Sequence, residues 1–261
     1  MNIIMKKNGN GYKKELLYGL LGIVIFILLW FLVSAIVQER KLIFPSPIDT
    51  IQEFGLLLKD TYTYKCIAFT LFKATIGFLF ALVMAIIFGI FGGIFKKFHL
   101  TFSPLVTALK AIPTASFLFL FIVMVNYDYA PVLVVIFICF PGLYDAVVGG
   151  ITNIDKQLID ATRIESKSIL YNVRKVYFPL AFNYIAVGMT ATFGLALKVE
   201  IMAEIISGST GYGIGNAMRL AQQTSVLMAP IFAWTLISVI LLLSITYLLK
   251  VVKSKLIKKD F

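Results

Sequence analysis

Long apolar runs without charged residues constrain this chain more than any other feature. The first run, Leu16–Val37, holds 22 consecutive uncharged residues, and about 20 apolar residues form a helix long enough to cross the hydrocarbon core of a bilayer. The apolar core of a cleaved signal peptide is shorter, about 7–15 residues. No small-residue cleavage site closes this run cleanly, so we expect it to remain as a membrane span.

Five more apolar runs follow the first, and together they predict an all-α integral membrane protein. Hydrophobic residues make up 60% of the chain, whereas soluble domains hold about 45–50%, so the surplus must face lipid. We expect about six transmembrane helices in a single transmembrane domain over residues 16–261, after a cytoplasmic N-terminus at 1–15. The five later runs are Ala74–Phe95, residues 102–126, Tyr129–Gly150, Val176–Leu197 and Val226–Leu249.

The positive charges predict how the spans are oriented. The net charge is +11, but Lys and Arg form short clusters at the ends of the apolar runs instead of a stripe on one folded face. Nucleic-acid binding is therefore not expected. With the N-terminus inside, the cytoplasmic segments hold 16 Lys and Arg and the outer segments hold 5. This asymmetry follows the positive-inside rule and predicts that both ends are cytoplasmic.

Small residues recur at every fourth position of the second run, at Ala81, Ala85, Gly89 and Gly93. This spacing places them on one helix face, where a second helix can approach closely. The third and fourth runs are joined by only a few residues around 126–128, so we expect them to be antiparallel neighbours. Their internal prolines favour a bundle with a lined interior, because neighbours or water must satisfy the freed carbonyl groups.

Two connecting segments are too long to be simple turns. In the outer segment 38–65, Phe44–Pro47 (Phe-Pro-Ser-Pro) cannot continue a helix. Asp49 and Thr50 are expected to cap a short amphipathic helix that lies in the interface. Its apolar positions are Ile51, Phe54, Leu57 and Leu58.

The cytoplasmic segment 151–179 predicts two short helices. The first covers about Lys156–Ile164, Ser166 or Ser168 caps the second, and Pro179 closes the segment. Apolar and charged faces on such a pair indicate a docking element for another protein. An amphipathic loop lying on the lipid surface is the alternative.

This segment also resembles a known family. Asp160-Ala161-Thr162-Arg163, followed by Ser166 and Phe178-Pro179, is similar to the coupling loop of binding-protein-dependent ABC importer permeases. In that pattern Asp160 stands for a Glu, Thr162 for an Ala, Ser166 for a Gly, and Phe178-Pro179 for Leu-Pro. The Phe44–Pro47 stretch, the glycine-rich second span, the Lys110–Pro113 region and Ala203–Gly213 resemble the nitrate/sulfonate/taurine-type branch. The resemblance covers about residues 40–250, and Lys198 and Glu200 are unusual for the branch.

The resemblance implies a function and a set of partners. It implies the permease subunit of an ATP-driven importer in the bacterial cell membrane, paired with a second permease copy or a sister chain. Two ATPase subunits would bind ATP and Mg on the cytoplasmic side, and an extracytoplasmic solute-binding protein would deliver a small solute. The residues it implies for ATPase coupling are Asp160, Ala161, Thr162, Arg163, Ser166 and Pro179.

Sequence motifs for catalysis or for a bound cofactor are missing. The chain has no G-x-x-x-x-G-K-[ST] phosphate loop, so ATP hydrolysis is expected on a separate chain. His99 is the only histidine, and a multi-histidine metal site or a Ser-His triad cannot be built from it. Cys66 and Cys139 lie in or beside apolar runs, far apart in sequence, and are expected to be ordinary helix residues.

Ionisable residues within the spans are the candidates for the translocation path. Such groups are costly in a bilayer and usually face a protein interior or a watery path. We expect Asp145, in the middle of the fourth run, to face the bundle interior. Lys198, Glu200 and Glu204 either line the outer part of the path or pair with neighbouring helices at the outer end of their span, and both interpretations remain open here.

A stand-alone carrier or channel driven by an ion gradient is the alternative function. Segment 155–179 discriminates between the two classes, because a stand-alone carrier does not need an ATPase-docking element. Secondary carriers of this size often contain inverted repeats, and no convincing repeat is found in this sequence.

Overall fold

The computed structural model describes residues 9–37, 44–155, 157–159 and 168–259, and the secondary structure in these ranges is helical without strands. The helices are α1 (Gly9–Ile36), α2 (Pro47–Leu57), α3 (Thr61–Ile94), α4 (Lys96–Ala111), α5 (Thr114–Met124), α6 (Ala130–Thr152), α8 (Ile169–Asn172), α9 (Phe178–Ser207), α10 (Ile214–Thr224) and α11 (Ala229–Lys259). A π-helical turn, Val173–Tyr177, joins α8 to α9.

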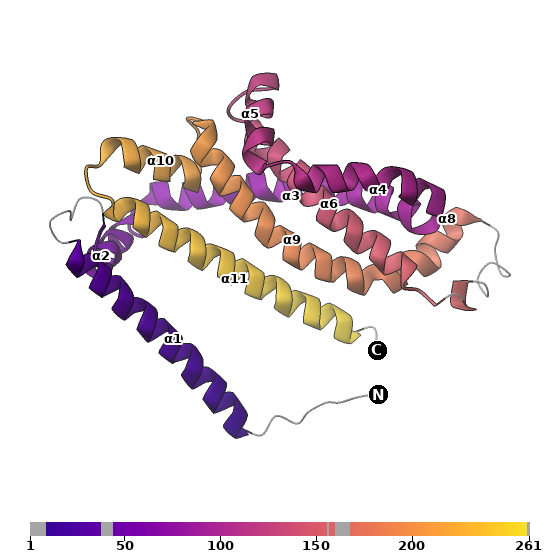
Figure 1. Cartoon of the computed structure of the whole chain (residues 1–261), viewed down its shortest axis with the longest axis horizontal. Coiled ribbons are helices and arrows are strands. Elements are labelled where there is room, and N and C mark those ends of the chain that lie inside the picture. Colours follow the sequence, from indigo (N-terminus) through magenta and orange to yellow (C-terminus); the bar gives the residue numbers. More distant parts are fainter. Residues whose placement is uncertain (1–8, 38–43, 156, 160–167, 260–261) are drawn as a thin grey trace.

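Helices α3, α6 and α9 form the core of the bundle (Figure 1). Along α3, Gly77 faces Val135 of α6, and Gly89 faces Val147 twelve residues further on, so the two helices run parallel. Gly93 continues the contact at Ile151. The predicted close packing of the small-residue face of the second run is confirmed, since Ala81 and Ala85 are also fully buried.

The number of spans agrees with the sequence prediction of about six. Five helices of the described chain are long and apolar enough to cross a membrane, and a sixth span is possible if α4 and α5 count as one. These two helices meet at a bend of 94°, where the sequence predicted one run over 102–126. Pro113 lies at the bend, because it has no N–H to donate and its ring clashes with a helix running through it.

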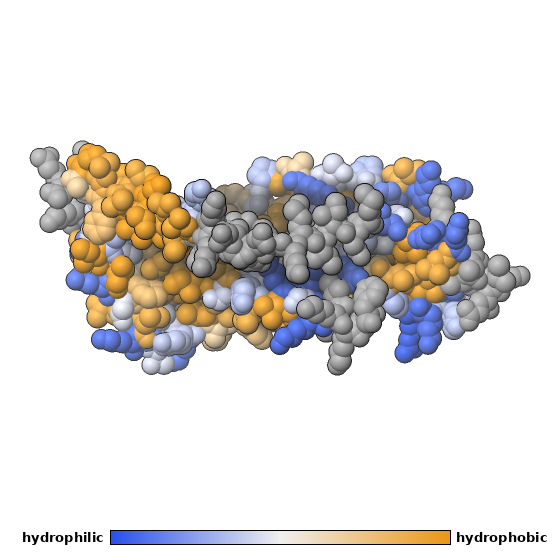
Figure 2. All heavy atoms as spheres, turned by 90° about the horizontal axis from the view of Figure 1, so that it is seen from below, coloured by the Kyte–Doolittle hydropathy of each residue, from blue (hydrophilic) through white to orange (hydrophobic). Residues whose placement is uncertain are grey.

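Helices α1 and α11 lie at the edge of the bundle. Near its end α1 is attached through Trp30, whose Nε1 donates to the Pro45 carbonyl over 3.1 Å and whose ring lies 6.0 Å from that of Phe232. The rest of α1 stands apart from the core (Figure 1) and carries exposed Leu, Ile and Phe side chains. Figure 2 shows broad hydrophobic surface on the side of the molecule where α1 and α2 lie. Such a surface suits contact with lipid.

The predicted short helix after Phe44–Pro47 is present as α2, but its cap differs from the prediction. Ser46 is the N-cap, and its hydroxyl accepts from the Asp49 amide over 3.1 Å. The Asp49 carboxylate accepts in return from the Ser46 amide over 3.2 Å. This capping box satisfies two helix-terminal donors, and it places the N-cap three residues before Asp49, with the helix starting at Pro47.

Pro179 does not close its segment, in contrast to the prediction. The chain continues as a helix from Ile169 through the π-helical turn into α9, and Pro179 lies in the first turn of α9. A proline is tolerated there because a first-turn N–H needs no intrahelical acceptor. The Phe178 amide donates to the Val173 carbonyl, five residues back, as a π turn requires.

Replacing Gly89 with Val should weaken the contact between α3 and α6. A Cβ atom at this position would lie 2.6 Å from the Val147 Cβ, and such overpacking typically costs about 1–3 kcal/mol. We expect a lower melting temperature for the detergent-purified protein. Gly149→Ala is the control, because a Cβ at Gly149 of α6 meets nothing within 4 Å. Equal melting temperatures for the two variants would contradict this packing.

Candidate functional site

Five of the six predicted coupling residues lie outside the described residues. The five are Asp160, Ala161, Thr162, Arg163 and Ser166. Pro179, the sixth, is exposed on α9.

The chain returning from this segment is anchored to the end of α6. Tyr177 is buried in one cluster with Val147 and Ile151 of α6, whereas Arg174 and Lys175 are exposed beside it. Residues 174–177 are therefore attached to the end of α6 through Tyr177 and continue directly into α9.

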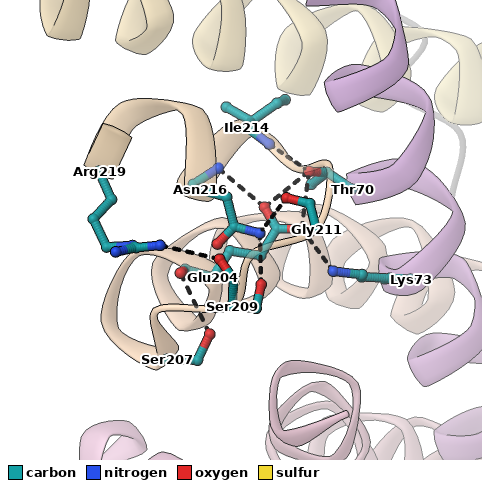
Figure 3. A network of polar contacts seen from close by, with 10 residues as sticks. Thr70, Lys73, Glu204, Ser207, Ser209, Gly211, Ile214, Asn216 and Arg219 are labelled. Atoms are coloured by element: carbon teal, nitrogen blue, oxygen red, sulfur yellow. Dashed lines mark hydrogen bonds and ion pairs between the residues drawn. The ribbon is translucent and has the colours of Figure 1, made fainter. Parts of the chain in front are cut away.

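Glu204 is the centre of a buried polar network between α9, α3 and the start of α10 (Figure 3). Its carboxylate is fully buried and accepts from the Thr70 hydroxyl at 2.9 Å and the Gly215 amide at 3.0 Å. Lys73 contributes an ion pair, with Nζ 3.6 Å from Glu204 Oε1. The Thr70 hydroxyl also accepts from the Ile214 amide at 2.8 Å. Thr70 of α3 and Glu204 of α9 thereby hold the start of α10 directly.

The glycine-rich loop between α9 and α10 is fixed by further hydrogen bonds (Figure 3). Gly208 ends α9 with φ of 73°, in the left-handed region that favours glycine. The Asn216 amide group donates to the Ser209 hydroxyl at 2.6 Å and to the Gly211 carbonyl at 3.0 Å. Arg219 donates to the Gly208 and Ser209 carbonyls. The glycine-rich loop is therefore a turn held by side chains of both α9 and α10.

Glu200 lies one helical turn before Glu204, in a very different setting. Its side chain is also fully buried, but neither carboxylate oxygen has a hydrogen-bond partner within the described chain. Lys198 is exposed and lines a groove between α9 and α11 with Met202 and Ser238. The three residues therefore do not form one site.

Asp145 differs from its prediction. Within the single chain it lies on the exposed face of α6 instead of in the bundle interior, and it forms an ion pair with Lys110 of α4. The sequence alone does not identify Lys110 as the partner of Asp145. In the same way it does not show that Lys73, which is 17% exposed, pairs with Glu204.

A metal centre is not formed by the residues that the structure describes. No three His, Cys, Asp or Glu side chains among them come close enough together to hold an ion. His99 lies beside the Tyr144 hydroxyl, with Nδ1 and the oxygen 3.2 Å apart. The arrangement therefore offers buried polar contacts and exposed ion pairs between helices.

A family model decides the family of this chain. Residues 85–258, more than half of the chain, match the model described as binding-protein-dependent transport system inner membrane component. The chain belongs to this family. It is a permease subunit of an ABC importer and a multi-pass inner-membrane protein, and the family has ATPase and binding-protein partners.

Two curated relatives cover most of the permease. The putative aliphatic sulfonates transport permease protein SsuC of Bacillus subtilis (strain 168) is 24% identical over 211 residues, which are 80% of this chain and 76% of the relative. The nitrate import permease protein NrtB of Leptolyngbya laminosa is 25% identical over 199 residues, 71% of each chain. These matches do not favour a stand-alone carrier.

A solved structure has the same fold. A chain of the MetNI methionine ABC transporter in an inward-facing conformation superimposes with a TM-score of 0.64 at 19% identity. The match covers 76% of the permease and 95% of the other chain.

Replacing Glu204 with Gln should loosen the loop at the start of α10, whereas Glu200→Gln should not. The Glu204 carboxylate accepts charge-assisted bonds, each worth about 1.5–3 kcal/mol, and an amide offers a single acceptor oxygen and no charge to Lys73. Glu200 accepts no hydrogen bond within the described chain, so its replacement by an amide breaks none.

Hydrogen exchange of the detergent-purified protein measures the difference between the two variants. We expect faster exchange at the Ile214 and Gly215 amides in Glu204→Gln and unchanged exchange in Glu200→Gln. Equal protection in both variants would show that the Glu204 network does not hold the loop.

Proposed function

We propose that this permease carries a small solute with a compact anionic group, delivered by an extracytoplasmic solute-binding protein. The observation that supports this class is that the printed names of two relatives refer to anions, aliphatic sulfonates and nitrate. The net positive charge of the chain does not itself support an anionic solute, because most of this charge lies at the ends of the spans.

The proposed assembly pairs this chain with a second copy or a sister chain on two ATPase subunits. Both chain ends face the cytoplasm, residues 1–15 form the cytoplasmic N-terminus, and residues 16–261 form one transmembrane domain. ATP and Mg bind the ATPases, and this chain holds no cofactor of its own.

Segment 151–179 is proposed as the contact with the ATPase, through Asp160, Ala161, Thr162, Arg163, Ser166 and Pro179. Its support is the position of its described ends. It leaves the end of α6 and returns through Tyr177, which is buried against α6, so ATPase movement would reach two core helices at once.

The residues predicted for the path take different proposed roles. Asp145 and Lys198, both exposed within spans, are candidates for groups that the solute passes. Glu204 positions the loop at the start of α10 and does not contact solute. Glu200 lies one helical turn before Glu204 on α9. The Glu200→Gln variant and its hydrogen exchange, described above, test whether it also holds this loop.

Reversing the charges of the coupling segment should release the ATPase. We would purify the tagged permease with its ATPase and measure the mass of the intact complex, which we expect to contain two permeases and two ATPases. Asp160→Lys with Arg163→Glu should remove the ATPase while the permease stays folded, because both docking charges then repel their partners.

The matched control reverses two exposed charges before the starts of α3 and α6, with Lys59→Glu and Asp128→Lys. This variant should retain the ATPase. If both double variants retain it, the segment is not the docking element. If the permease never binds an ATPase under any nucleotide condition, the assembly itself is wrong.

The solute class is tested on the partner solute-binding protein. Its intrinsic fluorescence should change on addition of nitrate or a short alkanesulfonate and should not change with an uncharged analogue of the same size. Binding only of cationic or neutral solutes would contradict the anionic class and leave the permease assembly unaffected.

A further inference from the structure

The ion pair between Lys110 and Asp145 occupies an unusual place for two opposite charges. It joins the end of α4 to the exposed face of α6, and the Lys110 and Asp145 side chains keep 45% and 52% of their surface exposed. In the buried ion pair, the Glu204 side chain is 0% exposed and the Lys73 side chain is 17% exposed. The pair therefore presents charge outward from the chain instead of sealing it inside.

Asp145 lies at the depth of the hydrocarbon core. It precedes the end of α6 at Thr152 by seven residues, or about 10 Å at the rise of an α-helix. The whole of α6 is only slightly longer than a bilayer core of about 30 Å. Charged groups at such a depth rarely face lipid and normally meet protein or a water-filled cavity.

Several exposed positions near the pair carry small side chains. On α4 they are Thr107, Ala108 and Ala111, and on α6 Gly142, although Leu105 and Ile112 are exposed as well. On α1, by contrast, the exposed side chains are large and apolar, such as Phe26 at 64%. Small residues on a membrane helix suit close approach by other groups, and a charge beside them is normally covered by protein or water instead of lipid.

The break in the span supplies a second, independent observation. Helix α4 ends at Ala111, one residue after Lys110, and the chain turns by 94° into α5. The last carbonyl groups of a helix have no partner within it. Within a membrane such a break is tolerated where it is buried in protein or lines a water-filled cavity, and Pro113 is exposed at this break.

We propose that the Lys110–Asp145 pair lies in the wall of the water-filled translocation path and that Lys110 transiently binds the anionic group of the solute. An ammonium group has three donors, and Asp145 uses one of them through Oδ2. The others remain for a sulfonate, nitrate or carboxylate oxygen. This inference rests on the proposed anionic solute.

Asp145 has a specific role in this arrangement. A lone lysine in a path would hold an anion tightly, whereas conduction needs binding strong enough for entry and weak enough for release. The Asp145 carboxylate competes with the solute for the Lys110 ammonium group, and it neutralises the Lys110 charge when no solute is bound. Lys110 is thus the contact for the solute, and Asp145 sets how weakly it binds.

Cysteine accessibility tests the proposal in membranes that contain the full complex. We would use Thr107→Cys, one helical turn before Lys110 on the same face of α4, and Asp145→Cys. The two native cysteines, Cys66 and Cys139, are fully buried, so the parent protein supplies the background. The probes are sulfonatoethyl methanethiosulfonate, which is anionic, and trimethylammonioethyl methanethiosulfonate, which is cationic.

Both cysteines should react, and Asp145→Cys should react about tenfold faster with the anionic probe, because Lys110 is then unpaired. Adding Lys110→Met should abolish the preference while the reaction itself persists. In Thr107→Cys, where the pair is intact, the preference should be small and should increase with Asp145→Asn. Phe26→Cys on α1 is the lipid-facing control and should react with neither probe.

Three results would overturn the proposal. If neither cysteine reacts in any nucleotide state, the pair faces lipid or is covered by a second permease. If both react without charge preference, Lys110 does not attract anions. If the preference survives Lys110→Met, another cation causes it. ATPase co-purification from the same membranes separates these failures from a failure of the importer assembly.

Discussion

The close contact of α6 with α3 on one side and α9 on the other determines the rest of the structure. Within a bilayer the hydrophobic effect does not drive helices together, so packing and polar contacts must do so. Glycine at positions 77 and 89 lets valine side chains of α6 approach the α3 backbone. At the other face, Gly150 of α6 meets Ala181 and Tyr184 of α9. Because these contacts leave no room for a Cβ, they fix the register of the three helices.

Polar contacts complete this core at one end of the bundle. Glu204 extends from α9 to Thr70 and Lys73 of α3, and the same carboxylate holds the Gly215 amide. A fully buried carboxylate is stable only when paired and hydrogen-bonded, so the network also explains why a charge is tolerated there. It links α3 and α9 to α10. At the other end of the bundle, the π-helical turn Val173–Tyr177 continues into α9, and Tyr177 packs against Val147 and Ile151 of α6.

Sequence patterns were most informative where the relevant contacts are local. The spacing of Ala81, Ala85, Gly89 and Gly93 predicted the packed face of α3, and the proline-rich stretch before α2 predicted its start to within a few residues. The cap was expected at Asp49 and Thr50, whereas Ser46 is the N-cap and Asp49 is the third helical residue that completes its capping box. Pro179 was read as a stop, although a proline in the first turn of a helix is equally compatible with a start.

Partners far apart in the chain could not be predicted. A single sequence does not show that Lys73 lies beside Glu204 in space, or that Lys110 lies beside Asp145. For the same reason the sequence left open whether Glu204 lines a path or pairs with other helices, and the structure shows its pairing with α3. For Asp145 a signal was available, because it is the single charge within the apolar run Tyr129–Gly150.

The central claim is that the helical core moves solute only when an ATPase acts on segment 151–179. Uptake into proteoliposomes tests it most directly, with the complex, the solute-binding protein and the labelled anion that this protein binds. The account predicts uptake that requires ATP and persists when ionophores collapse the ion gradients. Uptake by the permease alone, driven by an ion gradient without ATP, would contradict it.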